Sequence, residues 1–406
     1  MLSQFTVKNY KSIRDEMTFD MQATAISEHT DRLIQAGNAD LFLPVSTIYG
    51  PNGGGKTNVL QALHTLAQKV LRPLYAAEAD LNSRLQAKNL EITPFAFDAK
   101  SKNTPTEFEV FFWTAKAEYR YILHVLRETI IYESLSLRKV ETNRTTDVFE
   151  RENGSIHIGD GFRKLKVSEY LSDTLPLLSY LAITYRKNEV IGDCIHWIEN
   201  GIKFLNYGNP IQEMMPVLEG STELKPLILN MIREMDLDID DFRIEKREIG
   251  ENQIFTKHIL DGHAYEINLT DESSGTKKLF GLLPFIAESL TKGTTLVIDE
   301  LDAKIHPALL KHIIMLYNNC EINKHGAQLI FTSHDLSTMN SEIFRRDEIW
   351  FVAKGNEQNS KLFSLVEFKN PSGASVRKDA KFDKQYLEGK YGADPYLQKI
   401  IDWSVI

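Results

Sequence analysis

The segment Gly50-Pro51-Asn52-Gly53-Gly54-Gly55-Lys56-Thr57 constrains this chain more than any other feature of its sequence. It follows an apolar, strand-like run over residues 43–49 and precedes a helical pattern over 58–69. A glycine-rich loop in that position turns backbone N–H groups toward a phosphate at the positive end of the helix dipole. The pattern predicts a nucleotide-binding loop in which Lys56 reaches the β- and γ-phosphates and Thr57 binds Mg²⁺.

A second apolar run, residues 295–298, ends in the two carboxylates Asp299 and Glu300. In a chain that also has a phosphate loop, this pattern is typical of the metal-associated acidic strand of ATPases. We expect Asp299 to lie in the Mg²⁺ shell. Glu300 points elsewhere, so we expect it to act as the general base on the attacking water. The predicted cofactors are ATP and Mg²⁺.

The order of the predicted elements indicates an α/β fold. After residue 294 the pattern alternates between strands at 295–299, 328–333 and 348–352 and a helix at 307–318, which is typical of a parallel sheet with crossover helices. Residues 92–158 instead contain alternating, aromatic-rich segments, which predict an antiparallel sheet. Its expected strands are 92–97, 108–113, 119–126, 130–138 and 148–158.

The remaining middle part of the chain, residues 167–237, is mostly helical by period and has no sustained heptads. It is followed by a hairpin signal at Asp261-Gly262. We therefore expect a mixed parallel sheet core, an antiparallel β lobe and an inserted helical subdomain. The expected parts are 1–165 with the phosphate loop and β lobe, 166–240 with the helices, and 241–406 with the acidic strand. The length of 406 residues leaves the number of independent domains open.

Composition excludes several classes of protein. The formal net charge is −9, which argues against a uniformly basic nucleic-acid-binding surface and leaves only a local patch. Cys194 and Cys320 are the two cysteines, in no metal-ligand spacing, so we expect a reducing, cytoplasmic compartment. The first residues lack the order of a signal peptide, and the densest apolar run, 279–287, is too short to span a bilayer. We expect neither export nor a membrane partner.

Three short motifs stand in a fixed order around the acidic strand. Ser273-Ser274-Gly275-Thr276-Lys277 opens a helix before it, Asp302 follows Glu300-Leu301, and Phe331-Thr332-Ser333-His334-Asp335 ends a later strand. Taken alone, Ser273 fits an ordinary helix N-cap and His334 fits a core or capping histidine. Together with the phosphate loop, the motifs resemble the signature, D-loop and switch histidine of the ABC-type ATPase head found in SMC and RecF proteins.

The resemblance implies that ATP lies between two copies of the chain. Ser273, Ser274 and Gly275 of one copy would bind the γ-phosphate held by the phosphate loop of the other, with Asp302 at the same interface. His334 would contact the γ-phosphate in its own copy and position the water for Glu300. The implied assembly is an ATP-dependent homodimer or higher homo-oligomer. The glutamine that ABC heads carry before their helical region is unassigned here, and Gln86 is only a weak candidate.

Longer segments resemble a narrower group, the AAA-type ATPases of bacterial phage-defence loci, of the RloA and PtuA kind. They are residues 5–12, 299–307, 345–351 and 386–395. This resemblance implies an ATPase that acts as sensor or regulator of an effector. Some relatives carry a nuclease domain after the ATPase, and the segment after His334 is too short for one. We therefore expect the effector, a nuclease or toxin, to be a separate protein.

Two alternatives stay open. A RecF- or SMC-like protein would use the ATP clamp itself to hold DNA in repair or maintenance, although missing heptads and an acidic charge disfavour it. A transporter ATPase subunit would need a membrane partner. The pair Arg345-Arg346 could contact phosphate or an acidic partner, but an ordinary solvated surface is the expectation we adopt.

Overall fold

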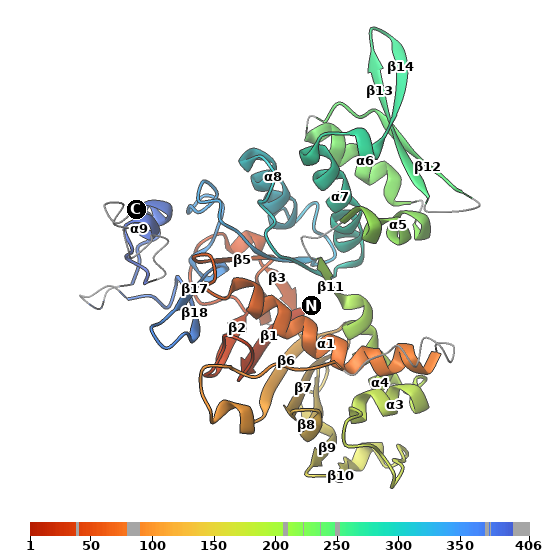
Figure 1. Ribbon diagram of the computed structural model, residues 1–406, viewed down its shortest axis with the longest axis vertical. Helices are drawn as coiled ribbons and strands as arrows, with labels where there is room; N and C mark the ends of the chain where they lie inside the picture. The colour runs from red at the N-terminus through yellow and green to blue at the C-terminus, as the bar shows by residue number, and fades with distance from the viewer. Residues whose placement is uncertain are drawn as a thin grey trace, which may run out of the picture.

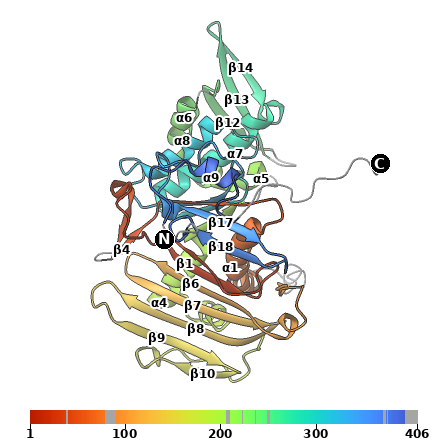
Figure 2. The same cartoon turned by 90° about the vertical axis from the view of Figure 1, so that its left-hand side faces the viewer.

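The computed structural model describes residues 1–37, 40–78, 90–205, 210–221, 223–235, 237–247, 252–369, 373 and 375–392. Two large sheets follow one another along the long axis of the molecule, with the antiparallel one lowest in Figures 1 and 2 and a thin hairpin at the opposite end. The predicted α/β architecture is confirmed. Within the described residues, the longer helices lack the apolar stretch that a bilayer crossing requires.

The central sheet has the strand order β11-β15-β16-β5-β17-β18, in which only the pair β17 and β18 is antiparallel. The predicted mixed sheet with a parallel core is thus correct. One strand, β11, was not predicted. The strand bounds are β5 Val45–Tyr49, β11 Ile202–Leu205, β15 Thr295–Ile298, β16 Gln328–Thr332, β17 Ile349–Lys354 and β18 Ser360–Ser364.

The β lobe is a seven-stranded sheet in the order β10-β9-β8-β7-β6-β1-β2, antiparallel throughout. The expected strand over 92–97 is wrong, because the N–H of Phe95 donates to the side chain of Asn9 (3.0 Å) instead of to a neighbouring strand. The N-terminal strands take the edge of the sheet. The bounds are β1 Leu2–Lys8, β2 Met17–Asp20, β6 Thr106–Trp113, β7 Ala117–Leu126, β8 Thr129–Lys139, β9 Thr145–Glu152 and β10 Ser155–Ile158.

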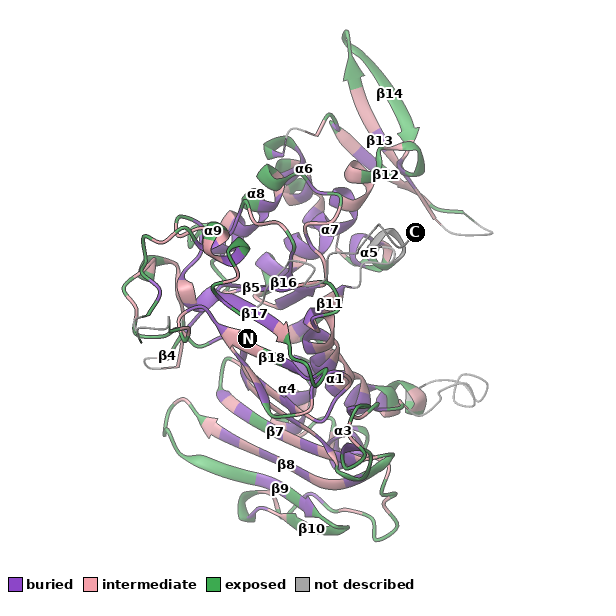
Figure 3. Ribbon diagram, turned by 60° about the vertical axis from the view of Figure 1, so that its left-hand side comes forward, coloured by how far each residue is buried: buried purple, intermediate pink, exposed green. Residues whose placement is uncertain are grey.

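The two faces of the central sheet bury different cores, as the alternation of side chains along a strand requires. Val297 and Ile330 face the helix α1 (Lys56–Glu78) and the β lobe. Their neighbours in the chain, Leu296 and Leu329, face the helices α7 (Ser274–Lys292) and α8 (Pro307–Asn318). The sheet is therefore covered on both sides, and its inner strands β5, β15 and β16 are buried along their whole length, as Figure 3 shows for β5 and β16.

The predicted helical insertion, 166–240, does not pack as one unit. Helices α3 (Leu177–Tyr185) and α4 (Glu189–His196) join the core of α1 and the β lobe. Helices α5 (Pro210–Gly220) and α6 (Leu224–Glu234) join the core of α7 instead. Between these two pairs the chain forms β11, the edge strand of the central sheet, and each pair of helices covers a different face. The division into parts at residues 165 and 240 stays a prediction.

The hairpin expected at Asp261-Gly262 is confirmed, with both residues at positive φ (51° and 78°), as a two-residue hairpin turn prefers. It joins β13 and β14, and the outer part of this ribbon is exposed (Figure 3). The bounds of the remaining strands and the last described helix are β3 Ile34–Ala36, β4 Asp40–Phe42, β12 Asp241–Glu245, β13 Gln253–Leu260, β14 His263–Asn268 and α9 Phe382–Leu387.

The expectation that Arg345 and Arg346 lie on a solvated surface is wrong. Arg345 is fully buried and its guanidinium forms a two-pronged ion pair with Asp347 (2.9 and 2.8 Å). It also donates to the carbonyl oxygens of Thr24 and Glu28, and Arg346 pairs with the side chain of Glu28. These arginines therefore fasten the N-terminal segment to the start of β17, a contact that only long-range folding creates.

The same cluster contains Glu348, which is also fully buried. One carboxylate oxygen accepts the N–H of Arg345 (2.8 Å), and the other has no hydrogen-bond partner among the described residues. Burial raises the pKa of Glu348 from 4.5 to about 8. An acid whose pKa is raised on folding favours the folded state below its unfolded pKa, and that preference is lost as the pH rises toward the folded value.

We therefore predict that Glu348→Gln, which imitates the protonated acid, stabilises the protein increasingly between pH 4.5 and 8. At pH 8 the gain should be on the order of 4 kcal/mol, since the pKa rises from 4.5 to about 8, each pKa unit corresponds to about 1.4 kcal/mol, and the folded group is half ionised at that pH. Thermal unfolding midpoints of wild type and variant at pH 5, 6.5 and 8 would measure it. Glu342→Gln, at an exposed position nearby, is the control. A difference that does not depend on pH would contradict the prediction.

Candidate nucleotide and magnesium site

The loop after β5 has no room for side chains at two of its glycines. A Cβ at Gly50 would lie 2.4 Å from the carbonyl oxygen of Val352, and one at Gly55 would lie 2.3 Å from Ser360 Oγ. Both glycines also have positive φ (157° and 112°), which larger residues disfavour. The backbone at residues 50–55 therefore lies directly against β17 and β18, and these glycines are a steric requirement of the fold.

Two serines support this loop through its main chain and the first turn of α1. Ser360 Oγ lies 2.7 Å from the carbonyl oxygen of Gly54 and 2.8 Å from Ser12 Oγ. Ser12 in turn accepts a bond from Asn58 Nδ2 (2.7 Å), in the first turn of α1. Ser12 belongs to an N-terminal segment used in the family resemblance, but its role here was not predicted. Ser360 carries no sequence signal, because only folding brings β18 under the loop.

Lys56 is enclosed by its own loop. Its ammonium donates to the carbonyl oxygens of Gly50 (2.8 Å) and Pro51 (3.2 Å), and the residue is 7% exposed. Burial lowers the pKa of Lys56 to about 8, and the nearby carboxylates of Asp299 and Glu300 act in the opposite direction. The loop thus holds a cation at its centre, the arrangement that suits a bound phosphate.

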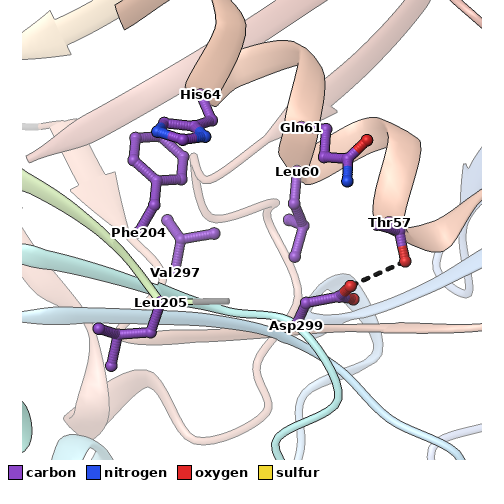
Figure 4. Close-up of a pocket in the computed structure, with 8 residues that line it drawn as sticks. All are labelled: Thr57, Leu60, Gln61, His64, Phe204, Leu205, Val297 and Asp299. Carbon is purple, nitrogen blue, oxygen red and sulfur yellow. Dashed lines mark hydrogen bonds between the residues drawn. The ribbon is translucent and has the colours of Figure 1, made fainter. Parts of the chain in front are cut away.

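The hydroxyl of Thr57 and the carboxylate of Asp299 meet where α1 begins and β15 ends. Thr57 Oγ1 donates to Asp299 Oδ2 over 2.8 Å (Figure 4). A hydroxyl and a carboxylate are hard oxygen ligands, and Mg²⁺ bound with substrate phosphates uses few protein ligands. The donor set therefore fits the predicted ion. Beside this contact lies a small cavity, where the rings of His64 and Phe204 are tilted by 34° to each other with their centroids 4.7 Å apart.

Thr332 joins the two acidic residues, although its role was not predicted from the sequence. Its hydroxyl donates to Asp299 Oδ1 (2.6 Å) and accepts the main-chain N–H of Glu300 (2.7 Å). Glu300 adopts a left-handed conformation with φ of 51°, which turns the chain out of the direction of β15. Such strain persists only where the surroundings fix it, and it is frequent at functional sites.

Asp302 and His334 lie at the same edge of the sheet. The main-chain N–H of His334 donates to Asp302 Oδ2 (3.1 Å). Burial lowers the pKa of the His334 imidazole, the charge of Lys56 lowers it further, and the carboxylates of Asp302, Glu300 and Asp299 oppose the shift. The structure thus brings together six predicted residues from the segments that follow β5, β15 and β16, namely Lys56, Thr57, Asp299, Glu300, Asp302 and His334. Their roles stay predictions.

Residues 273–275 of the signature segment are not hydrogen-bonded to this group in the part of the chain that the structure describes. Ser273 is exposed and caps α7, with its Oγ accepting the N–H of Thr276 (3.1 Å), so the simpler reading as an N-cap describes its geometry in one copy. Among the hydrogen bonds of the described residues, none joins Ser273, Ser274 or Gly275 to the phosphate loop. Gln86, the weak candidate for the family glutamine, lies outside the described residues.

We predict that Thr332→Val lowers the turnover of ATP roughly 10–100-fold, the usual effect of losing a group that orients a metal ligand. Valine keeps the shape of this buried side chain but leaves Asp299 and the N–H of Glu300 without their shared partner. The Mg²⁺ concentration that gives half-maximal turnover should also rise. Turnover measured over a series of Mg²⁺ concentrations is the test, and Thr332→Ser, which keeps the hydroxyl, is the control. Equal behaviour of the valine variant and wild type would refute the role.

The family match agrees with the predicted ATPase. The family described as "AAA domain, putative AbiEii toxin, Type IV TA system" matches residues 45–340, which include the phosphate loop, the acidic strand and His334. No curated protein matches the chain.

Among solved structures, the SMC head domain from Thermotoga maritima is 15% identical with a TM-score of 0.41, over 89% of this chain and 98% of that one. An Smc head domain with an extended coiled coil, bound to the C-terminal domain of ScpA and derived from Pyrococcus furiosus, is 12% identical with a TM-score of 0.41, over 89% and 96%. The family match spans well over half of the sequence. This chain therefore belongs to that AAA-domain family of phosphate-loop ATPases.

Proposed function

We propose that this protein binds ATP and Mg²⁺, dimerises around the nucleotide and hydrolyses it to ADP and phosphate. We further propose that this cycle makes it a sensor or regulator of a separate effector, a nuclease or toxin, in bacterial defence against phages. The observation that carries the enzymatic part is the contact of Thr57 with Asp299, fixed by Thr332 beside Glu300.

The hydrolytic step assigns one task to each side chain. The N–H groups of the loop bind phosphate oxygens, and Lys56 gives up its loop carbonyls to bind them as well. Thr57 and Asp299 would hold Mg²⁺, which when bound offsets the charge that develops on the phosphates. Glu300 takes a proton from the attacking water, and His334 orients that water.

The exposed position of the signature segment supports a second copy. Ser273 and Ser274 are exposed at the start of α7, where the helix dipole is positive. They make no hydrogen bond to the phosphate loop of their own chain among the described residues. In the proposed dimer these groups, with Gly275 and Asp302, complete the site of the partner. The family description, which names a putative toxin of a type IV TA system, supports a role in a toxin-containing system. That the effector is a separate protein rests on the resemblance to the ATPases of phage-defence loci.

We predict that Glu300→Gln retains ATP binding but slows hydrolysis roughly 10²–10⁴-fold, because the variant loses the base that acts on water. Lys56→Ala should instead weaken nucleotide binding, since the cation at the centre of the loop is removed. Equilibrium binding of a fluorescent ATP analogue and phosphate release would be measured for both. Near-normal turnover of Glu300→Gln would remove Glu300 as the base.

The effector is best sought with the same variant. Glu300→Gln should accumulate the ATP-closed form, so we predict that affinity purification with the neighbouring gene products retains a stoichiometric nuclease or toxin-like protein. Mass spectrometry would identify it, and Lys56→Ala, which should not close, is the control. Recovery of only DNA with replication or repair proteins would refute the defence role and favour a DNA clamp of the RecF or SMC kind.

A further inference from the structure

The main chain of Glu300 is held from both sides by side chains of other elements. Its N–H donates to Thr332 Oγ1 on β16 (2.7 Å), and its carbonyl oxygen accepts a bond from Lys278 Nζ on α7 (2.9 Å). The residue between these two bonds has a φ of 51°. A left-handed conformation costs a non-glycine residue on the order of 1–3 kcal/mol. The two hydrogen bonds therefore help to hold the main chain of Glu300 in a conformation that it would otherwise leave.

Lys278 lies within the acidic part of the site. It is partly buried, and burial lowers its pKa to about 8, while the carboxylates of Asp302 and Glu300 oppose the shift. The adjacent Lys277 differs, because its ammonium turns back to the carbonyl oxygen of Thr270 (2.9 Å) ahead of the helix. The direction of Lys278 is therefore specific to its place on α7.

Lys278 also stands close to the signature segment. It follows Ser273 by little more than one turn of the same helix, and the body of that helix is buried in the second core. A second close approach connects the same parts, because a Cβ at Gly275 would lie 3.3 Å from the carbonyl oxygen of Lys304. Because closely packed helices move as rigid bodies, a displacement of the helix start at Ser273 also displaces Lys278.

We infer that Lys278 is a positioning residue that fixes the main chain of Glu300 and couples the position of the signature segment to the general base. The inference rests on the proposed function. When the start of α7 binds the nucleotide of the partner copy, the bond from Lys278 sets the carbonyl of Glu300 and with it the direction of the carboxylate. Hydrolysis thereby depends on a correctly seated partner, and Lys278 acts through the main chain of Glu300.

The test compares Lys278→Met with wild type and with Lys292→Met, a control at the exposed end of the same helix, where the lysine pairs with Glu288. Lys278→Met should lower kcat roughly 10–100-fold. The KM for ATP, the affinity for a fluorescent ATP analogue and the thermal unfolding midpoint should stay near wild type. Lys278→Arg should restore much of kcat, because it keeps a cationic donor of similar reach. Lys278→Gln has a side chain too short to reach the carbonyl oxygen of Glu300, so its kcat should match that of Lys278→Met. It replaces Lys278→Met in the test if the methionine variant is unstable.

A double variant shows whether Lys278 acts through Glu300. In the Glu300→Gln background, Lys278→Met should cause no further loss in single-turnover hydrolysis, since the base it positions is already gone. Independent, multiplicative losses would overturn the inference, and so would a normal kcat of Lys278→Met or Lys278→Gln beside an active wild type. Absence of hydrolysis by the wild type would instead overturn the proposed function itself, so the two failures are distinguishable.

Discussion

The parallel pairing of β5, β15 and β16 is the constraint on which the rest of this structure depends. Ile298 pairs with Phe331, and Thr332 pairs with Ile48, so the three strands end at one edge of the sheet. The segment after β5 is the phosphate loop, the segment after β15 contains Asp299 and Glu300, and the segment after β16 contains His334. A change of register by one residue would turn every side chain to the other face and separate Thr57 from Asp299.

The chain protects this register by burying both faces of the central sheet. One face packs against α1 and the β lobe, and the other packs against α7 and α8. A helix from each core also contributes residues to the site. Helix α1 begins with Lys56 and Thr57, and Lys278 on α7 donates to the carbonyl oxygen of Glu300. Stability and site geometry therefore rest on the same contacts, and the strained conformation of Glu300 is tolerated because its surroundings are rigid.

Much of the site could be predicted from the sequence because its parts are local. The glycines of residues 50–55, the carboxylates after an apolar strand and the histidine after another are each recognisable within one short segment. The residues that support them could not be found in that way. Thr332, Ser360, Ser12 and Lys278 make their contacts across the fold, and a threonine, serine or lysine carries no signal of such a contact by itself.

The sequence by itself determined the kinds and order of most elements and predicted the chemistry of the site, since side-chain periodicity and backbone requirements act over a few residues. Only the tertiary structure decided that β1 and β2 join the β lobe, that β11 enters the central sheet and that the helices of 166–240 divide between two cores. It also decided that Arg345 is a buried anchor instead of a surface charge. These features arise from contacts between segments that are far apart in the sequence, and the packing of the whole chain decides which of those contacts form.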